Sequence, residues 1–409
     1  MSLVKTIVII NDFAYINGGA GQVALTSAIG LARNGYQVIL IAAVGPVMPE
    51  LLLAGVRVEL TDQYEIANDP NRLRAIRQGL WNFSSQELTI KLLSELNTAS
   101  TIVHIHSWTK ALSSSIVRVT IRCGFKVICT LHDYFIACPN GGFFDYQDQT
   151  ICRKLPLSLD CISKNCDVRS YPQKIWRVIR HNIQNSIGFI PNGINNFISI
   201  SDFSYSVLKP FLPSQSKIFR IINPIDIEKD EKVNVSSNRI VIFVGRLSPE
   251  KGVLLLAAAA NRLNLSPVFV GDGEARDSIL AACPNARITG WVSKNEVKEH
   301  LKSARVLVLP SLWYETQGLV VAEAAAMGVP SIVPDSCAAR EMVSDGETGL
   351  WFRGGQVDDL VNKIYSMLND YYCTELGTNA YVSYWNNSNS LANHIYSLEN
   401  CYENILSNE

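Results

Sequence analysis

The sequence has no apolar run that approaches the about 20 residues needed to cross a membrane, so we expect no membrane-spanning helix. It also has no basic excess, because 36 Lys and Arg stand against 37 Asp and Glu, with a net charge of -1. We therefore expect no nucleic-acid partner. The first residues, MSLVKTIVIINDF, lack a small-residue cleavage site and predict a β-strand rather than a signal peptide. We expect a cytoplasmic protein, with peripheral attachment at the inner face of a membrane left open.

What is present is a globular composition, with 47% hydrophobic and 18% charged residues in a chain of 409. That length suits two domains of about 150–200 residues each. Near the start, strand patterns at Lys5–Ile10 and Gln37–Ile41 flank a Gly-rich loop and a helical pattern at Gln22–Asn34. This is a βαβ unit, which predicts a parallel sheet with helices on both faces.

A polar, charged stretch at Asp226–Asn238 interrupts this alternation, which restarts with a strand at Arg239–Val244. We therefore predict two Rossmann-like, doubly wound α/β domains, the first over residues 1–222 and the second over 223–380. Doubly wound sheets bind ligands at the carboxyl ends of their strands, so the cleft between the domains is the expected site. A G-x-G-x-x-G fingerprint is absent, which makes a dehydrogenase a distant alternative.

The segment YETQGLVVAE carries two acids at the carboxyl end of a predicted strand. Glu315 lies on the loop, and Glu323 lies in the first turns of a helix that begins at about Leu319. The unpaired N–H groups near Gly318, Leu319 and Val320 predict an anion site for a diphosphate. Two flanking carboxylates match the hydroxyls of a nucleotide sugar. From spacing alone, a solvated loop acid and a favourable charge at a helix N-terminus explain the pair equally well.

The sequence resembles a known family at this segment and elsewhere. WYETQGLVVAEAAAMGVPSIVPD resembles the E-x7-E signature of the family-4 retaining glycosyltransferases with the GT-B fold. FVGRLSPEKG, VGDGEAR, ITGWVSKNEV and EMVSDGETGLWF follow in the family's order, and INPID, NGGAG and LHD also match. The resemblance implies a nucleoside-diphosphate sugar donor, a saccharide or lipid-linked acceptor, and a C-terminal helical segment, 381–409, that packs back on the first domain.

The same resemblance implies roles for individual residues. The expected catalytic groups are His132, Glu315, Arg246 and Lys251. The expected donor-binding residues are Gly18, Gly19, Arg246, Lys251, Trp291, Val292, Glu315, Gly318, Leu319, Val320 and Glu323. Arg246 and Lys251 would hold the diphosphate, Gly18 and Gly19 would close over it, and Trp291 and Val292 would contact the base. Glu315 would face the transferred sugar and Glu323 the ribose. Taken alone, Arg246 and Lys251 fit a solvated loop, and His132 fits a packed residue bonded by Asp133.

The expected mechanism is a front-face displacement in which the leaving phosphate takes the acceptor's proton. No D-x-D pattern occurs in the expected active-site loops of the first domain, so the sequence calls for no catalytic metal. The chain departs from many relatives at Gln317, where they have an aromatic residue. An amide there bonds the donor sugar or only lines the loop.

Four cysteines cluster in an insertion at about 136–172, beside His132. Cys138, Cys152, Cys161 and Cys166 predict a structural tetrathiolate zinc site, although paired C-x2-C spacing is absent. One or two disulfides, or plain thiols, are the alternatives. The basic stretch Lys174–His181 fits a solvated helix face, or a face that docks on an anionic membrane.

The function predicted from the sequence is transfer of a hexose-type sugar to a hydroxyl, in cell-surface polysaccharide synthesis. A GT-B nucleotide-sugar epimerase and a non-catalytic nucleotide-sugar-binding protein are the alternatives.

Overall fold

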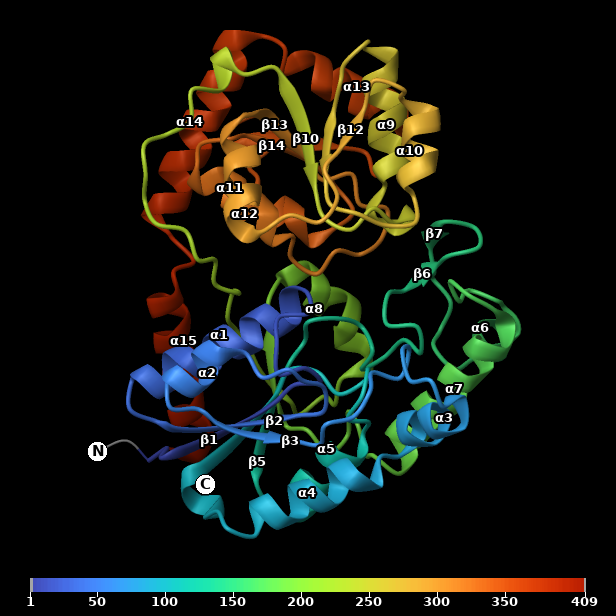
Figure 1. Cartoon of the computed structure of the whole chain (residues 1–409), viewed down its shortest axis with the longest axis vertical. Coiled ribbons are helices and arrows are strands. Elements are labelled where there is room, and N and C mark those ends of the chain that lie inside the picture. The colour runs from blue at the N-terminus through green and yellow to red at the C-terminus, as the bar shows by residue number, and fades with distance from the viewer. Residues whose placement is uncertain (1–2, 408–409) are drawn as a thin grey trace.

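The first domain is built on a seven-stranded parallel sheet in the computed structural model, which describes residues 3–407 (Figure 1). The strands are β1 (Thr6–Ile10), β2 (Gln37–Ala42), β3 (Arg57–Leu60), β4 (Thr101–Ile105), β5 (Lys126–Thr130), β8 (Asn196–Ser199) and β9 (Lys217–Arg220). Their order is β3-β2-β1-β4-β5-β8-β9, and neighbouring strands run parallel. The order reverses between β1 and β4, which places the loops after these strands where such sheets bind ligands.

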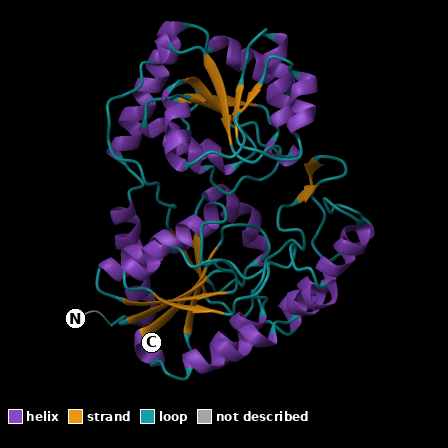
Figure 2. Cartoon of the chain, in the orientation of Figure 1, coloured by secondary structure: helices purple, strands orange, loops and turns teal. Residues whose placement is uncertain are grey.

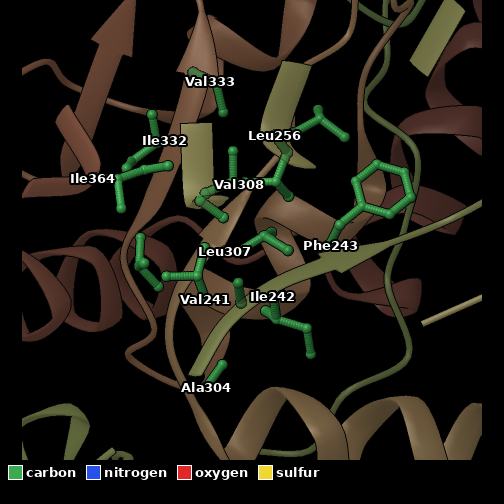
Figure 3. Close-up of a cluster of buried hydrophobic side chains, with 14 of the residues drawn as sticks. Val241, Ile242, Phe243, Leu256, Ala304, Leu307, Val308, Ile332, Val333 and Ile364 are labelled. Carbon is green, nitrogen blue, oxygen red and sulfur yellow. The ribbon is translucent and has the colours of Figure 1, made fainter. Parts of the chain in front are cut away.

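The second domain repeats this plan with a six-stranded sheet. Its strands are β10 (Ile240–Val244), β11 (Val268–Val270), β12 (Arg287–Ile288), β13 (Ala304–Val308), β14 (Ser331–Pro334) and β15 (Gly349–Phe352), in the order β12-β11-β10-β13-β14-β15. Strand side chains such as Val241, Leu307 and Ile332 are fully buried against Leu256 and Ile364 of the covering helices (Figure 3). The strands are continuously apolar because helices cover both faces of the sheet.

Helices cover both faces of each sheet, as the sequence predicted (Figure 2). Those of the first domain are α1 (Gly19–Arg33), α2 (Pro49–Leu53), α3 (Arg72–Leu80), α4 (Phe83–Leu93), α5 (Ser115–Arg122), α7 (Tyr171–Ser186) and α8 (Asp202–Leu208). Those of the second are α9 (Val253–Arg262), α10 (Arg276–Ala282), α11 (Lys294–Lys302), α12 (Leu319–Ala326), α13 (Val357–Ser366) and α14 (Asp370–Asn386). Helix α1 begins three residues before the expected Gln22, because the glycine loop itself winds into the first turn after Gly18.

The last helix, α15 (Leu391–Ser407), packs against α1 of the first domain. Ile395, Leu398 and Tyr402 belong to the core of that domain, which confirms that the C-terminal helix returns to it. The expected boundary after residue 380 falls inside α14. The chain instead passes between the domains at 387–390, because α14 continues to Asn386 along the second domain.

The insertion forms a small lobe at the edge of the first domain. It contains the antiparallel hairpin β6 (Phe144–Asp145) and β7 (Thr150–Ile151), followed by α6 (Leu159–Ser163), and the hairpin reaches toward the second domain (Figure 1). Between residues 3 and 407, no helix is both long and apolar enough to cross a membrane.

Candidate active site

Glu315 and Lys251 form an ion pair at the carboxyl edge of the second sheet. Lys251 Nζ donates to Glu315 Oε2 at 2.6 Å, and the same oxygen accepts from Trp313 Nε1 at 3.1 Å and from Ser311 Oγ at 3.2 Å. Burial alone would raise the pKa of Glu315, but Lys251 and these hydrogen bonds outweigh burial and hold the pKa below its usual value. Glu315 is therefore an ionised carboxylate. No described residue donates to its Oε1, which leaves that oxygen able to accept from a ligand.

Two helix N-termini from opposite domains meet beside this pair. Helix α12 begins after Gly318, which has a φ of 85°, and α1 begins after Gly18, which has a φ of 90°, and neither has a side-chain cap. A side chain on Gly19 would contact Leu319 at 3.8 Å, so the glycine loop approaches the start of α12 closely. The first N–H groups of both helices are therefore free to bind an anion between them. The structure brings the predicted Gly18, Gly19, Gly318 and Leu319 together, with Val320 in the first turn of α12.

Lys251 is positioned by a tight turn at the start of α9, and this turn requires a glycine. It ends the short turn Pro249–Lys251, and Gly252, at a φ of 68°, begins α9. A Cβ atom on Gly252 would lie 1.9 Å from the carbonyl oxygen of Pro310, so the loop after β10 packs directly on the loop after β13. This contact brings Lys251 to Glu315 across 64 residues of sequence.

His132 reaches the site from the first domain. Its carbonyl oxygen accepts a hydrogen bond from Thr316 Oγ1 of the second domain at 3.0 Å. Its Nε2 lies 2.9 Å from Nδ1 of His106, and the two rings stack. Burial lowers the pKa of His132 to about 3, so the imidazole is neutral at ordinary pH. A neutral ring can both donate and accept a hydrogen bond.

Behind His132, His106 contacts further buried side chains. The ring of His104 lies tilted against that of His106 with centroids 4.0 Å apart, and its Nδ1 lies 2.7 Å from the Tyr402 hydroxyl on α15. Burial lowers the pKa of both His104 and His106 well below the usual value. The C-terminal helix therefore supports the position of His132.

Arg246 lies on the rim of the site. Its side chain is 59% exposed, and its guanidinium donates to Glu250 at 2.5 Å, which leaves other N–H groups able to bind a ligand. The insertion also borders this rim, because a side chain on Gly142 would meet the Trp313 ring at 3.3 Å. Burial, reinforced by the nearby charge of Glu250, raises the pKa of Tyr146 in the same insertion to about 12.

The remaining predicted residues lie outside this set of direct contacts. Glu323 is half-buried on α12, where burial raises its pKa above the usual value. Trp291 is 72% exposed on the loop after β12, and Val292 packs on the core of the second domain. That loop is joined to the loop after β11 by a bridge between Gly271 and Gly290. Their contacts with a base or a ribose stay predictions.

Sequence reasoning missed three residues that build the site. Ser311 and Trp313 orient Glu315, and Thr316 joins it to the first domain. All three follow β13, the same strand that precedes Glu315. Their position at the carboxyl end of this strand was the one sequence feature that indicated a site.

Two of the four cysteines of the insertion contact a buried lysine. Cys138, Cys161 and Cys166 are buried and Cys152 is half-buried. The ammonium of Lys174, which has no exposed surface, lies 3.2 Å from Cys166 Sγ and 3.5 Å from Cys161 Sγ. Over residues 3–407, no group of three or more His, Cys, Asp and Glu side chains is arranged to hold a metal ion. The zinc site stays a prediction.

The basic stretch Lys174–His181 is neither a solvated face nor a docking face. Lys174 and His181 are buried, Arg177 pairs with the buried Asp167 at 2.7 Å, and Arg180 donates to Thr109 O at 2.9 Å. Sequence reasoning was wrong here because charged side chains turn inward where buried partners satisfy them.

Comparisons with known proteins agree with this geometry. Residues 225–383 match the family model described as "Glycosyl transferases group 1". An uncharacterized glycosyltransferase of Methanocaldococcus jannaschii is 25% identical over 373 residues, which cover 84% of this chain and 83% of the relative. A GDP-mannose-dependent alpha-mannosyltransferase of Mycolicibacterium smegmatis is 42% identical over 111 residues, 27% of this chain and 29% of that protein.

Solved structures resemble the whole chain. Sucrose-phosphate synthase of Thermosynechococcus elongatus superposes with a TM-score of 0.72 at 15% identity and covers 99% of this chain and 100% of its own. Anabaena HepE in complex with UDP superposes with a TM-score of 0.65 at 14% identity, over 98% of this chain and 100% of its own. The two facing domains and the returning C-terminal helix show that the chain has the GT-B fold, and the second domain is similar to the group 1 glycosyltransferases.

Proposed function

We propose that this glycosyltransferase moves a hexose-type sugar, with retention of configuration, from a nucleoside-diphosphate sugar to a hydroxyl of a saccharide or lipid-linked saccharide. The observation that carries the proposal is the Lys251–Glu315 pair, 2.6 Å apart, beside the N-termini of α1 and α12. A diphosphate between these helices would meet unpaired N–H groups from both domains. Lys251 uses one of its N–H groups on Glu315 and retains two for a phosphate oxygen.

The same contacts favour front-face displacement over a covalent intermediate. Glu315 Oε2 already accepts three hydrogen bonds and its pKa is lowered, which makes the carboxylate a weak nucleophile. As the glycosidic bond breaks, negative charge grows on the diphosphate. Lys251, Arg246 and the helix N-termini stabilise that charge without requiring a metal ion. A leaving phosphate oxygen takes the proton of the attacking hydroxyl on the same face.

A panel of nucleotide sugars tests the reaction, with product formation followed by mass spectrometry with and without saccharide acceptors. We expect acceptor-dependent transfer and an α-linked product from an α-linked donor, read by NMR. A changed sugar without acceptor would indicate an epimerase instead. Absence of turnover and of binding with every donor would overturn the proposal.

We place the enzyme in the cytoplasm, in cell-surface polysaccharide synthesis, which fits its ten free cysteines. For contact with an anionic membrane surface we propose the loop before α6 in place of the buried basic stretch. Leu155 is 66% exposed and Leu159 85% exposed, next to the exposed Arg153 and Lys154.

Cosedimentation with phosphatidylglycerol vesicles tests this loop. The double variant Leu155→Ser, Leu159→Ser should lose binding, whereas Leu53→Ser, which changes a leucine 86% exposed on α2, should not. Equal binding by both variants would remove the loop from the proposal.

A further inference from the structure

We infer that Gln317 selects the donor sugar by hydrogen bonding one of its hydroxyls, an assignment that rests on the proposed function. Gln317 is 5% exposed, and neither its Oε1 nor its Nε2 has a hydrogen-bond partner within residues 3–407. Both polar atoms of this amide are buried and unpaired in the loop between Glu315 and Gly318.

Such an amide is costly unless something else pairs with it. A buried polar group without a partner costs about 1–3 kcal/mol, and folded proteins contain few of them. A carbohydrate hydroxyl both donates and accepts, so it matches an amide that offers an N–H group and an oxygen together. A phosphate oxygen would satisfy only the N–H group.

A comparison inside the same protein shows what a structural amide looks like. Gln184 is 4% exposed, its Oε1 accepts from Trp108 Nε1 at 3.2 Å, and its Nε2 donates to Phe135 O at 3.1 Å. The two glutamines are buried to the same degree. Only Gln317 lacks protein partners at both atoms.

The chain neighbours of Gln317 are the basis on which we place its amide beside the sugar. Thr316 bonds the carbonyl oxygen of His132, and Leu319 approaches Gly19, so the residues on both sides contact the first domain. The Tyr134 hydroxyl is buried and unpaired as well, and the charge of Glu315 acts on it. Among residues 3–407, unpaired buried polar side chains thus lie two residues along the chain from Glu315 and from His132.

The first test needs no donor. In the free enzyme, Gln317→Met removes two unpaired polar atoms and should leave the melting temperature unchanged or raise it. Gln184→Met removes two hydrogen bonds and should lower it by about 2 °C or more. If Gln317→Met lowers the melting temperature as Gln184→Met does, the amide has a structural role and the inference fails.

The second test uses the donor that gives the fastest transfer in the panel. Gln317→Met should lower kcat/KM about 10- to 100-fold, because a site built to bond a hydroxyl depends on that bond. Its affinity for the nucleoside diphosphate alone should stay within about twofold. Deoxy donors should show which hydroxyl is recognised, since its removal should slow the wild type but not the variant.

Equal discrimination among deoxy donors by wild type and Gln317→Met would overturn the inference while leaving sugar transfer intact. Failure of every donor would overturn the proposed function instead, and the melting comparison would still decide the role of Gln317.

Discussion

Thr316 donates its hydroxyl hydrogen to the carbonyl oxygen of His132 at 3.0 Å, from the second domain to the first. The bond joins the loop that carries Glu315 to the loop that carries His132 in the first domain. This bond therefore ties the two domains together one residue away from Glu315.

Thr316→Val should weaken this contact between the domains. The loss of one hydrogen bond, worth about 1 kcal/mol, should lower kcat/KM about fivefold. Thr316→Ser keeps the hydroxyl and serves as the control, with activity near that of the wild type. Steady-state kinetics at saturating acceptor measure the effect. Equal values of kcat/KM for both variants would show that catalysis does not depend on this hydrogen bond.

Lys251→Met should make the activity sensitive to acid. In the wild type, Lys251 and its neighbours hold the pKa of Glu315 below the usual value against the effect of burial. Without Lys251, burial dominates and the pKa rises, so protonation of Glu315 begins at higher pH as the pH falls. The acidic limb of the kcat/KM profile should shift upward, in addition to a general loss of rate. An unchanged acidic limb of the kcat/KM profile would show that Lys251 does not control the pKa of Glu315.

His132 should stay neutral throughout the working pH range. Burial lowers its pKa to about 3, so its ring should not titrate between about pH 5 and 8. NMR shifts of its ring protons, assigned by comparison with His132→Gln, measure this. A titration midpoint inside that range would contradict the neutral role and restore acid–base chemistry as an option.

Gly252→Ala should destabilise the second domain strongly. The added Cβ would lie 1.9 Å from Pro310 O, so the backbone must shift, at a cost of about 3 kcal/mol or more. Gly346→Ala is the matched control, because Gly346 has a φ of 77° with nothing within 4 Å of the added atom. Only the conformational cost of about 1–2 kcal/mol should appear there. Urea unfolding measures both, and equal losses would contradict the close approach at Pro310.

The alternation of strand and helix could be predicted from the sequence because each element is short and has turn residues at its ends. The helix expected at about Leu319 begins there, since Gly318 supplies the left-handed turn that its start requires. The return of the C-terminal helix was expected from resemblance alone. Its exact crossing at 387–390 was not, because nothing in the polar helical pattern of α14 marks where it leaves the second domain.

The basic stretch shows where local patterns fail. Lys174–His181 alternates charge and apolar residues as an exposed helix does, yet Lys174 lies among cysteines and Arg177 against Asp167. These partners come from the insertion, whose path no local pattern specifies.

The sequence by itself determined which residue types stand at the carboxyl ends of the strands: Glu315 after one, Lys251 after another and His132 in the other domain. Periodicity and glycine positions suffice for that, because they act over a few neighbouring residues. Only the tertiary structure decided that Lys251 pairs with Glu315, that Thr316 bonds His132, and that Gln317 is buried without a partner. Those relationships depend on the packing of loops far apart in the chain, where contact follows from three-dimensional shape rather than from local spacing.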